Sequence, residues 1–239
     1  MTKEYLKHLY KLRKDKKYRD EQKKVLIVGK KMVEELRSKP EKLILTKNAE
    51  PPSHLKGVAV LRIKDDTMQK LTGLKNPDGI CAEMAMPQSQ TFNGLKHVIA
   101  LDGIQDPGNL GTLIRTALSF NWDGVYIIDP SCDPYNDKAL RAAKGATFRI
   151  PIQVGPWSEL RELIRKNSWT PYAADMNGRP VDKAIKADKI LLLFGSEGQG
   201  ISHDAKLIST PVSIPMHQEM ESLNVAIAGG ILMYLLKKQ

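Results

Sequence analysis

Short apolar segments alternate with amphipathic segments along most of the chain, and this alternation predicts an α/β fold. Apolar runs at residues 25–28, 97–102, 124–129 and 189–194 have the length and composition of buried strands. Between them, residues 107–120 and 157–166 place apolar side chains three and four positions apart, the period of a helix with one buried face. Strands and helices in alternation predict a parallel sheet with helices on both faces.

Pro and Gly residues divide this pattern into two expected domains. Residues 87–96 are polar and contain Pro87 and Gly94, so we expect them to be an interdomain linker. The first domain, residues 25–86, has expected strands at 25–28, 43–45, 58–63 and 79–86 and helices at 30–37 and 67–72, with Thr67 as a helix cap. The second domain, residues 97–239, has further expected strands at 147–152, 171–175 and 211–214. Residues 1–24 form a basic, helical N-terminal extension in this division.

The last expected helix, Leu223–Leu236, is apolar or small on nearly every face. A helix of that kind belongs in a core or in an interface. Ser222 and Asn224 stand at its start, where a side-chain oxygen can accept a hydrogen bond from a free backbone N–H group. Taken alone, the segment is also explained by an ordinary buried C-terminal helix.

The charge of the chain is uneven. The formal net charge is +10, and the first 24 residues contribute +6 of it. Such a block binds phosphate backbones through counterion release, or serves as a solubilising tail. Charge alone does not separate RNA from DNA or from an anionic membrane.

The composition limits the cellular compartments and the cofactors that we expect for this protein. The sequence has no apolar run long enough to span a bilayer, and its N-terminal residues lack the apolar region of a secretory signal. Cys81 and Cys132 have no metal-binding spacing, which argues against zinc and against a disulfide framework. We therefore expect an intracellular protein, cytoplasmic or organellar (mitochondrion or chloroplast), with no membrane partner and no metal.

A first candidate motif reads LDGIQDPGNLGTLIRTA over residues 101–117. Asn109 precedes the first turn of the expected helix, where its amide is suited to capping. Arg115 lies roughly two turns into that helix, away from the buried face of Leu113. A planar, permanently charged guanidinium suits phosphate. A surface arginine on an amphipathic helix is the alternative.

A second motif, LLLFGSEGQGIS at residues 191–202, joins a buried strand to a loop with Gly195, Gly198 and Gly200. Loops at the C-terminal ends of parallel strands are where ligands bind, and glycines present backbone groups to a flat ligand. The spacing G-x-x-G-x-G differs from the dinucleotide fingerprint and from the P-loop. Glu197 is either a site carboxylate or a plain turn residue.

With the segment from Pro211 to Leu236, these two stretches resemble, in order and in distance, the three signature motifs of the SpoU/TrmH branch of the SPOUT RNA methyltransferases. The resemblance covers residues 97–239. It implies a parallel α/β sheet whose C-terminal part is tied in a deep trefoil knot. It also implies a homodimer that uses S-adenosylmethionine as methyl donor.

The resemblance implies roles for individual residues. The donor is expected to be held by Gly195, Gly198, Gly200, Ile214 and Leu223. The expected polar groups of the active site are Asn109, Arg115, Glu197, Ser222 and Asn224. In this reading Arg115 holds the target phosphate, helps to deprotonate the ribose 2′-hydroxyl and reaches the donor bound by the other subunit.

The first domain resembles the small substrate-binding domain that often precedes the SpoU catalytic domain. That domain has the fold of the ribosomal protein L30e group, which implies contact with RNA; a role in dimerisation or folding is the alternative. Together with Arg115, the expected RNA-binding residues are Lys30, which follows the first strand, Lys144 and Arg149. The segment from Lys144 to Arg149 is also consistent with residues that simply flank a strand.

The function expected from this resemblance is methylation of a ribose 2′-hydroxyl in structured RNA, either rRNA or tRNA. A first alternative is an RNA-binding or ribosome-assembly protein that kept the fold without the activity. A second is a dinucleotide-dependent oxidoreductase, which predicts binding of NAD in place of S-adenosylmethionine.

Overall fold

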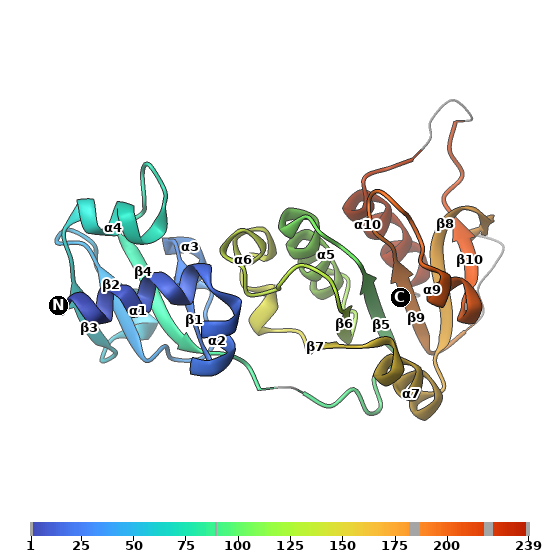
Figure 1. Ribbon diagram of the computed structural model, residues 1–239, viewed down its shortest axis with the longest axis horizontal. Helices are drawn as coiled ribbons and strands as arrows, with labels where there is room; N and C mark the ends of the chain where they lie inside the picture. The colour runs from blue at the N-terminus through green and yellow to red at the C-terminus, as the bar shows by residue number, and fades with distance from the viewer. Residues whose placement is uncertain (1, 89, 182–186, 218–221, 238–239) are drawn as a thin grey trace.

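The computed structural model describes residues 2–88, 90–181, 187–217 and 222–237, and it contains two α/β modules, each built on its own sheet (Figure 1). The sheet of the first module has the strand order β1-β4-β2-β3, and that of the second has the order β10-β8-β9-β5-β6-β7. Apolar residues of short strands form the centre of each module, as the alternating pattern predicts.

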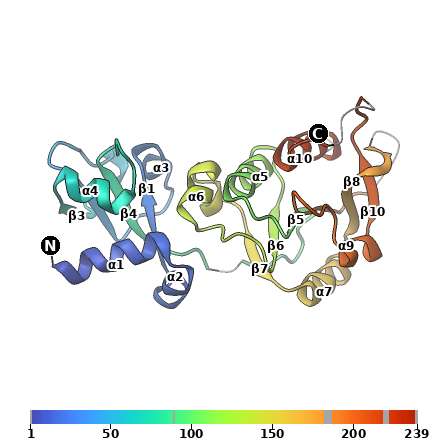
Figure 2. The ribbon, with the colours of Figure 1, turned by 45° about the horizontal axis from the view of Figure 1, so that its top comes forward.

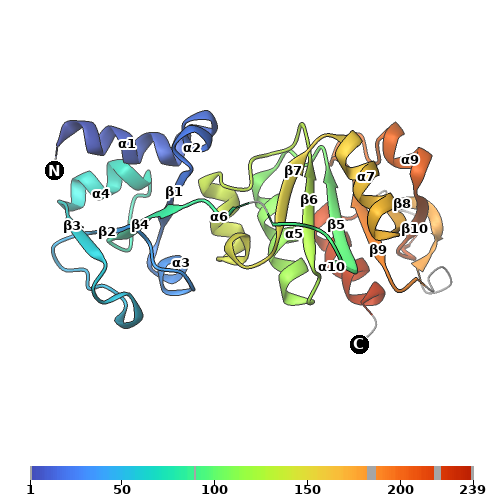
Figure 3. The ribbon, with the colours of Figure 1, turned by 90° about the horizontal axis from the view of Figure 1, so that it is seen from below.

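The first module has a mixed sheet with helices on both faces. Its strands are β1 (Lys24–Val28), β2 (Lys42–Leu45), β3 (Ala59–Arg62) and β4 (Ile80–Ala85), and its helices are α1 (Lys3–Lys14), α2 (Lys16–Gln22), α3 (Lys30–Glu34), η1 (Ser53–Leu55) and α4 (Asp65–Thr72). Strand β4 runs antiparallel to both β1 and β2, whereas β2 and β3 are parallel. Figure 3 shows α1 and α3 on opposite sides of this sheet.

Helix α1 belongs to the core of the first module, so the expected division at residue 24 does not match the packing. Leu9 and Leu12 are fully buried and pack in one cluster with Leu26 of β1 and Met68 of α4. The apolar positions of α1 recur at helical spacing among lysines, and that stripe covers one face of the sheet.

The second module confirms the parallel sheet with helices on both faces. Its strands are β5 (His97–Asp102), β6 (Gly124–Ile128), β7 (Ile152–Gly155), β8 (Thr170–Pro180), β9 (Ile190–Phe194) and β10 (Thr210–Ser213), and every described pairing is parallel. One apolar cluster joins the sheet to α5 (Pro107–Ser119), α6 (Asp137–Ala143) and α10 (Val225–Leu236). A second cluster joins the other face to α7 (Trp157–Asn167) and α9 (His203–Ile208).

Three local predictions are wrong. The strand expected at residues 147–152 begins only at Ile152, the first residue of β7, and the short helix η2 (Ala146–Phe148) lies where its start was expected. Thr67 does not cap α4, which begins at Asp65, because two acidic residues already stabilise the first turn. Ser222 does not cap the last helix, because Asn224 does so and α10 begins at Val225.

Helix α6 lies between the two modules (Figure 1, Figure 2). Its Leu140 is buried in the core of the first module, whereas Ala139 and Ala143 are buried in the core of the second. The guanidinium of Arg19 on α2 forms an ion pair with Asp133, in the loop before α6. The modules are therefore joined by apolar contacts and by a buried charge pair.

The chain between the modules, residues 86–96, contains no helix or strand over the positions that the structure describes. It is nevertheless anchored, because Phe92 is almost completely buried in edge-on contact with the rings of Tyr126 and Trp169. The indole N–H of Trp169 donates to the carbonyl of Leu95 at 2.7 Å. A segment whose polar composition is typical of a linker is thus held along the second module.

Candidate functional site

A cleft lies at the C-terminal edge of the second sheet, where parallel α/β sheets bind ligands. Its volume is about 540 Å³, within the usual range for small-molecule sites. The loop after β9, the segment after β10 and the start of α10 contribute most of its lining. Phe194, Val212, Ile214, Leu223 and Leu232 are among its apolar walls.

Three side chains from distant parts of the sequence are hydrogen-bonded in series beside this cleft. The amide nitrogen of Asn109 donates to Oε1 of Glu197 at 2.8 Å. The amide nitrogen of Asn224 donates to Oδ1 of Asn109 at 3.1 Å. The structure therefore brings together one residue from each of the three motifs.

Asn109 is free to make these bonds because it is not the cap of α5, contrary to the sequence prediction. The cap is Asp106, whose carboxylate accepts from the backbone N–H of Asn109 at 2.9 Å. Pro107 occupies the first helical position, where its missing N–H costs nothing. The hydrogen bond from Lys138, followed by that from Asn109, lowers the pKa of Asp106, so the capping carboxylate stays charged.

Asn224 combines capping with a bond across the site. Its Oδ1 accepts from the backbone N–H groups of Ala226 and Ile227 at the start of α10, at 2.9 and 3.4 Å. The amide nitrogen must then point away from the helix, toward Asn109. Ser222, two residues earlier, is exposed and lines the cleft.

The glycine loop has a backbone shape that side chains would prevent. A Cβ atom at Gly195 would lie 2.0 Å from the carbonyl oxygen of Gly200, and Gly200 itself has a φ of +66°. A bridge between Ser196 and Gly200, with an N–H to O distance of 2.9 Å, closes the turn. Gly195 and Gly200 line the cleft, but Gly198 does not.

The residues expected to bind phosphate and RNA lie outside the cleft. Arg115 is exposed on α5 and, within the part of the chain that the structure describes, its side chain has no hydrogen bond or ion pair. Glu197 is bonded to Asn109 rather than to Arg115 of the same chain. Lys144 and Arg149 are exposed at the second module, and Lys30 is exposed at the start of α3 in the first.

The cleft also contains polar residues that no sequence motif indicated. Asp175 and Asn177 come from the C-terminal half of β8, and Lys206 comes from α9. The only signal for the first two is that they lie in a strand whose C-terminal edge faces the site. Lys206 lies on a short helix that the apolar pattern did not predict.

Asp102, at the end of β5, is a further acidic group that the motifs left unassigned. Burial raises its pKa, and hydrogen bonds from Ser202 and Trp157 partly oppose the rise. Ser202 caps α9 directly after the glycine loop. Asp102 therefore lies beside the segment that ends the loop, and its buried Oδ2 has no hydrogen-bond partner among the described residues.

No group of three or more His, Cys, Asp and Glu residues able to hold a metal ion occurs among the described positions. Over the same positions, the structure has no helix whose length and apolar character suit a membrane crossing.

Comparison with known proteins identifies both modules. Residues 96–234 match the model of the SpoU rRNA Methylase family, and residues 3–82 match that of the MRM3-like substrate binding domain. The second match begins in α1, in agreement with the packing of that helix on the first sheet.

Several relatives and solved structures are similar to the chain. A 23S rRNA (guanosine(2553)-2′-O)-methyltransferase, RlmP, of Bacillus subtilis is 32% identical over 93% of this chain and 92% of its own length. A 23S rRNA (adenosine(1067)-2′-O)-methyltransferase of Streptomyces azureus is 33% identical over 57% of this chain and 52% of its own.

Among solved structures, an AdoMet-bound rRNA methyltransferase from Sinorhizobium meliloti superposes with a TM-score of 0.85 and 26% identity, covering 98% of this chain and 94% of that one. AviRb of Streptomyces viridochromogenes, solved in complex with AdoMet, shares the fold with a TM-score of 0.85 at 22% identity, over 98% of this chain and 97% of that one. The family match covers more than half of the chain and the Bacillus subtilis relative nearly all of it, so this chain belongs to the SpoU rRNA methylase family of RNA 2′-O-methyltransferases.

Proposed function

We propose that this protein transfers a methyl group from S-adenosylmethionine to a ribose 2′-hydroxyl of ribosomal RNA. The observation that carries the proposal is the bonded series Asn224, Asn109 and Glu197 beside a cleft with apolar walls. The similarity to the 23S rRNA methyltransferase of Bacillus subtilis over nearly its full length favours rRNA over tRNA.

The residues of the cleft fit the donor. At Gly195 the backbone approaches Gly200 so closely that no Cβ fits, and this turn presents backbone groups to a flat ring. Ile214 and Leu223 supply apolar walls on either side of the segment that leads into α10. When bound, S-adenosylmethionine supplies the methyl group that the ribose oxygen accepts.

The polar series fixes the orientation of each of its members. Because the oxygen of Asn224 accepts from the α10 backbone, its nitrogen points to Asn109, and the nitrogen of Asn109 in turn points to Glu197. A carboxylate accepts more than one hydrogen bond, so Glu197 also holds a ribose hydroxyl in this proposal. Ser222 and Asn224 lie close enough to the cleft to line the reacting end. Such positioning supplies much of the rate enhancement in displacement reactions.

Arg115 acts across a dimer interface in this proposal. It lies outside the cleft of its own chain, on the helix that packs against α10. Helix α10 exposes four apolar side chains: Ile227, Ile231, Tyr234 and Leu235. An exposed apolar patch is typical of a protein interface, so this patch supports a homodimer in which a second copy of the chain covers it. From there Arg115 holds the target phosphate, and in this proposal its fixed positive charge favours loss of the ribose hydroxyl proton to solvent.

The arrangement of the family supplies the remaining parts of the proposal. We assign residues 97–239 to the methyltransferase domain with its trefoil knot, and residues 3–86 to a substrate-binding module of the L30e type. The out-of-sequence order of β10, β8, β9 and β5 supports the knot. Lys30, Lys144 and Arg149, all exposed, are RNA contacts. A substrate of this class places the protein inside the cell, and bacterial relatives favour the cytoplasm.

The experiment is methylation of a 23S rRNA transcript and of bulk tRNA with labelled S-adenosylmethionine, followed by mapping of the 2′-O-methyl group. We expect incorporation into rRNA, and Arg115→Ala lowers the rate by roughly 10²–10⁴-fold while calorimetry shows unchanged donor binding. Normal methylation by this variant refutes the role of Arg115. A wild-type protein that binds RNA but neither donor nor NAD is an inactive RNA-binding module instead, and uptake of NAD indicates an oxidoreductase.

A further inference from the structure

Helix α1 has two faces with opposite chemistry. Its inner face buries Leu9 and Leu12 against the first sheet. Its outer face exposes four lysines and one tyrosine: Lys3, Lys7, Tyr10, Lys11 and Lys14. Each lysine is three or four positions from the next, and Tyr10 is three or four positions from Lys7 and Lys14, so the five residues form one stripe, roughly 16 Å long, along the helix.

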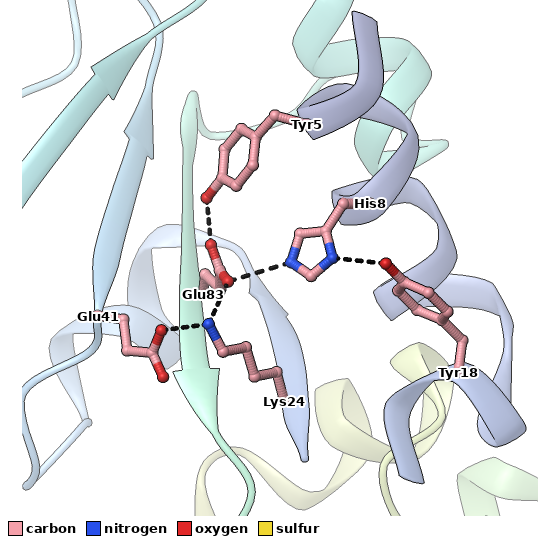
Figure 4. Close-up of polar contacts among 6 residues, drawn as sticks. All are labelled: Tyr5, His8, Tyr18, Lys24, Glu41 and Glu83. Atoms are coloured by element: carbon pink, nitrogen blue, oxygen red, sulfur yellow. Dashed lines mark hydrogen bonds and ion pairs between the residues drawn. The ribbon is translucent and has the colours of Figure 1, made fainter. Parts of the chain in front are cut away.

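A buried carboxylate fixes the rotation of α1 about its axis (Figure 4). Glu83 on β4 is 3% exposed, and it accepts hydrogen bonds from the hydroxyl of Tyr5 and from Nε2 of His8 at 3.1 Å. Lys24 of β1 completes the set with an N to O distance of 3.1 Å. Two consecutive turns of the helix are thus bonded to one strand, and the lysine stripe must face away from the sheet.

This anchor stays charged near neutral pH. Burial alone raises the pKa of Glu83, but the hydrogen bonds from Tyr5, His8 and Lys24 together outweigh it, and the net shift is downward. Nδ1 of His8 lies 2.8 Å from the hydroxyl of Tyr18, so α2 is joined to the same cluster. The direction in which α1 presents its lysines is therefore set by the fold.

The positive charge on the outer face is not neutralised by the protein. Within the described residues, none of the four lysines of the stripe forms an ion pair, and Glu4 is the only acidic residue of α1. Uncompensated lysines in a row along a helix are the electrostatic footprint of a polyanion site.

Tyr10 adds a feature that a merely solubilising face does not need. The residue is 40% exposed in the middle of the stripe. Nζ of Lys14 lies 4.8 Å from the ring centroid, and the guanidinium carbon of Arg13 lies 5.4 Å from it. Both cations lie over the ring, so an unpaired base that stacks on Tyr10 takes the place of the flexible Lys14 side chain, whose ammonium group then reaches a neighbouring phosphate.

We propose that this stripe, which we call the α1 face (Lys3, Lys7, Tyr10, Lys11 and Lys14), binds the backbone of the substrate RNA, with one unpaired base stacked on Tyr10. The inference rests on the proposed function and adds the surface that holds the substrate away from the reacting ribose. A membrane surface is the poorer partner. Amphipathic helices bind membranes through an apolar face, and that face of α1 is buried in the protein.

The experiment measures binding of a 23S rRNA transcript over a range of KCl concentrations. The triple variant Lys7→Gln, Lys11→Gln, Lys14→Gln is compared with the wild type and with the control Arg165→Gln, Lys166→Gln, which removes exposed cations from α7. Each lost phosphate contact lowers the slope of log affinity against log salt by about 0.7–0.9, so we expect a decrease of about 2 in the triple variant and none in the control.

Two further measurements separate binding from folding. Tyr10→Ala is expected to weaken RNA binding roughly tenfold, as loss of one stacked base does. Both variants keep the wild-type melting temperature and donor affinity, and Lys→Arg replacements at positions 7, 11 and 14 restore the slope.

An unchanged salt slope in the triple variant contradicts RNA binding by the α1 face, even when the enzyme methylates RNA. Failure of the wild type to methylate any RNA overturns the proposed function instead, and RNA binding through α1 then still registers in the slope. A wild type that binds vesicles containing phosphatidylserine but not the transcript overturns both inferences.

Discussion

Arg19 on α2 holds the two modules together, and its removal should destabilise the protein strongly. The side chain is 3% exposed although it carries a full charge. Its Nη1 donates to the carbonyls of Leu12 and Arg13 at 2.8 and 3.0 Å, and Nη2 forms the ion pair with Asp133 of the second module. The guanidinium therefore closes the end of α1 and reaches across the boundary between the modules.

The substitution Arg19→Ala removes the charged partner of the largely buried carboxylate of Asp133, whose Oδ1 still accepts from the backbone N–H of Tyr135, and it leaves the carbonyls of Leu12 and Arg13 without that donor. Loss of one member of a buried ion pair costs about 3–5 kcal/mol. For a chain of this size, each kcal/mol lowers the melting temperature by about 2–4 °C, so we expect a decrease of about 10 °C. Arg19→Lys retains one charged donor and should lower it by about half as much.

The assay is thermal unfolding followed by circular dichroism, with methylation of the 23S rRNA transcript measured below the melting temperature. The matched control is Arg161→Ala, which removes an ion pair with Asp204 in which both side chains are more than 40% exposed. Exposed pairs contribute about 0–1 kcal/mol, so the control should melt within a few degrees of the wild type. If Arg19→Ala melts as the control does, the charge pair does not join the modules and the reasoning is wrong.

Two further predictions concern the donor loop and the anchor of α1. Gly195→Ala places a Cβ atom 2.0 Å from the carbonyl of Gly200, so the loop must open and calorimetry should show at least a hundredfold loss of donor affinity with RNA binding unchanged; normal donor binding would contradict the assigned loop. Because the pKa of Glu83 is lowered in the folded state, its carboxylate stabilises the fold at pH values above the unfolded-state pKa of about 4.3. This stabilisation is lost as the pH falls through the pKa that Glu83 has in the folded protein. The melting temperature of the wild type should therefore exceed that of Glu83→Gln at pH 7 and approach it near pH 3; a difference that does not change with pH would contradict the assignment of the charge to Glu83.

The parallel sheet of the second module could be predicted because its strands are buried on both faces. Runs such as residues 190–194 are apolar at every position, and such a run has few other places in a fold. The place of α1 could not be predicted in the same way. Its apolar stripe indicates a helix, but the stripe does not reveal which sheet the helix packs against. In addition, the many lysines of α1 resemble those of a solvated tail.

The candidate site, too, could be predicted from motif spacing only in part. The three motifs indicate which loops meet, but not which side chain of a loop makes which bond. Asp106 and Asn109 are both suited to cap α5, and Pro107 at the first helical position is the signal that decides for Asp106. Asp175 and Lys206 had no signal, because their contribution to the cleft depends on strand order, which the sequence does not specify.

The contacts between the modules bear on how the RNA reaches the site. A Cβ atom at Gly111 of α5 would lie 2.2 Å from the carbonyl of Ala139 in α6, so the two helices touch at backbone distance. Helix α5 carries Asn109, and α6 is buried in the first module through Leu140. The α1 face is thus joined to the bonded series of the site through packed elements, without a free linker. For an RNA bound to the α1 face as we propose, we therefore expect the distance between α1 and the cleft to contribute to the choice of the ribose that is methylated.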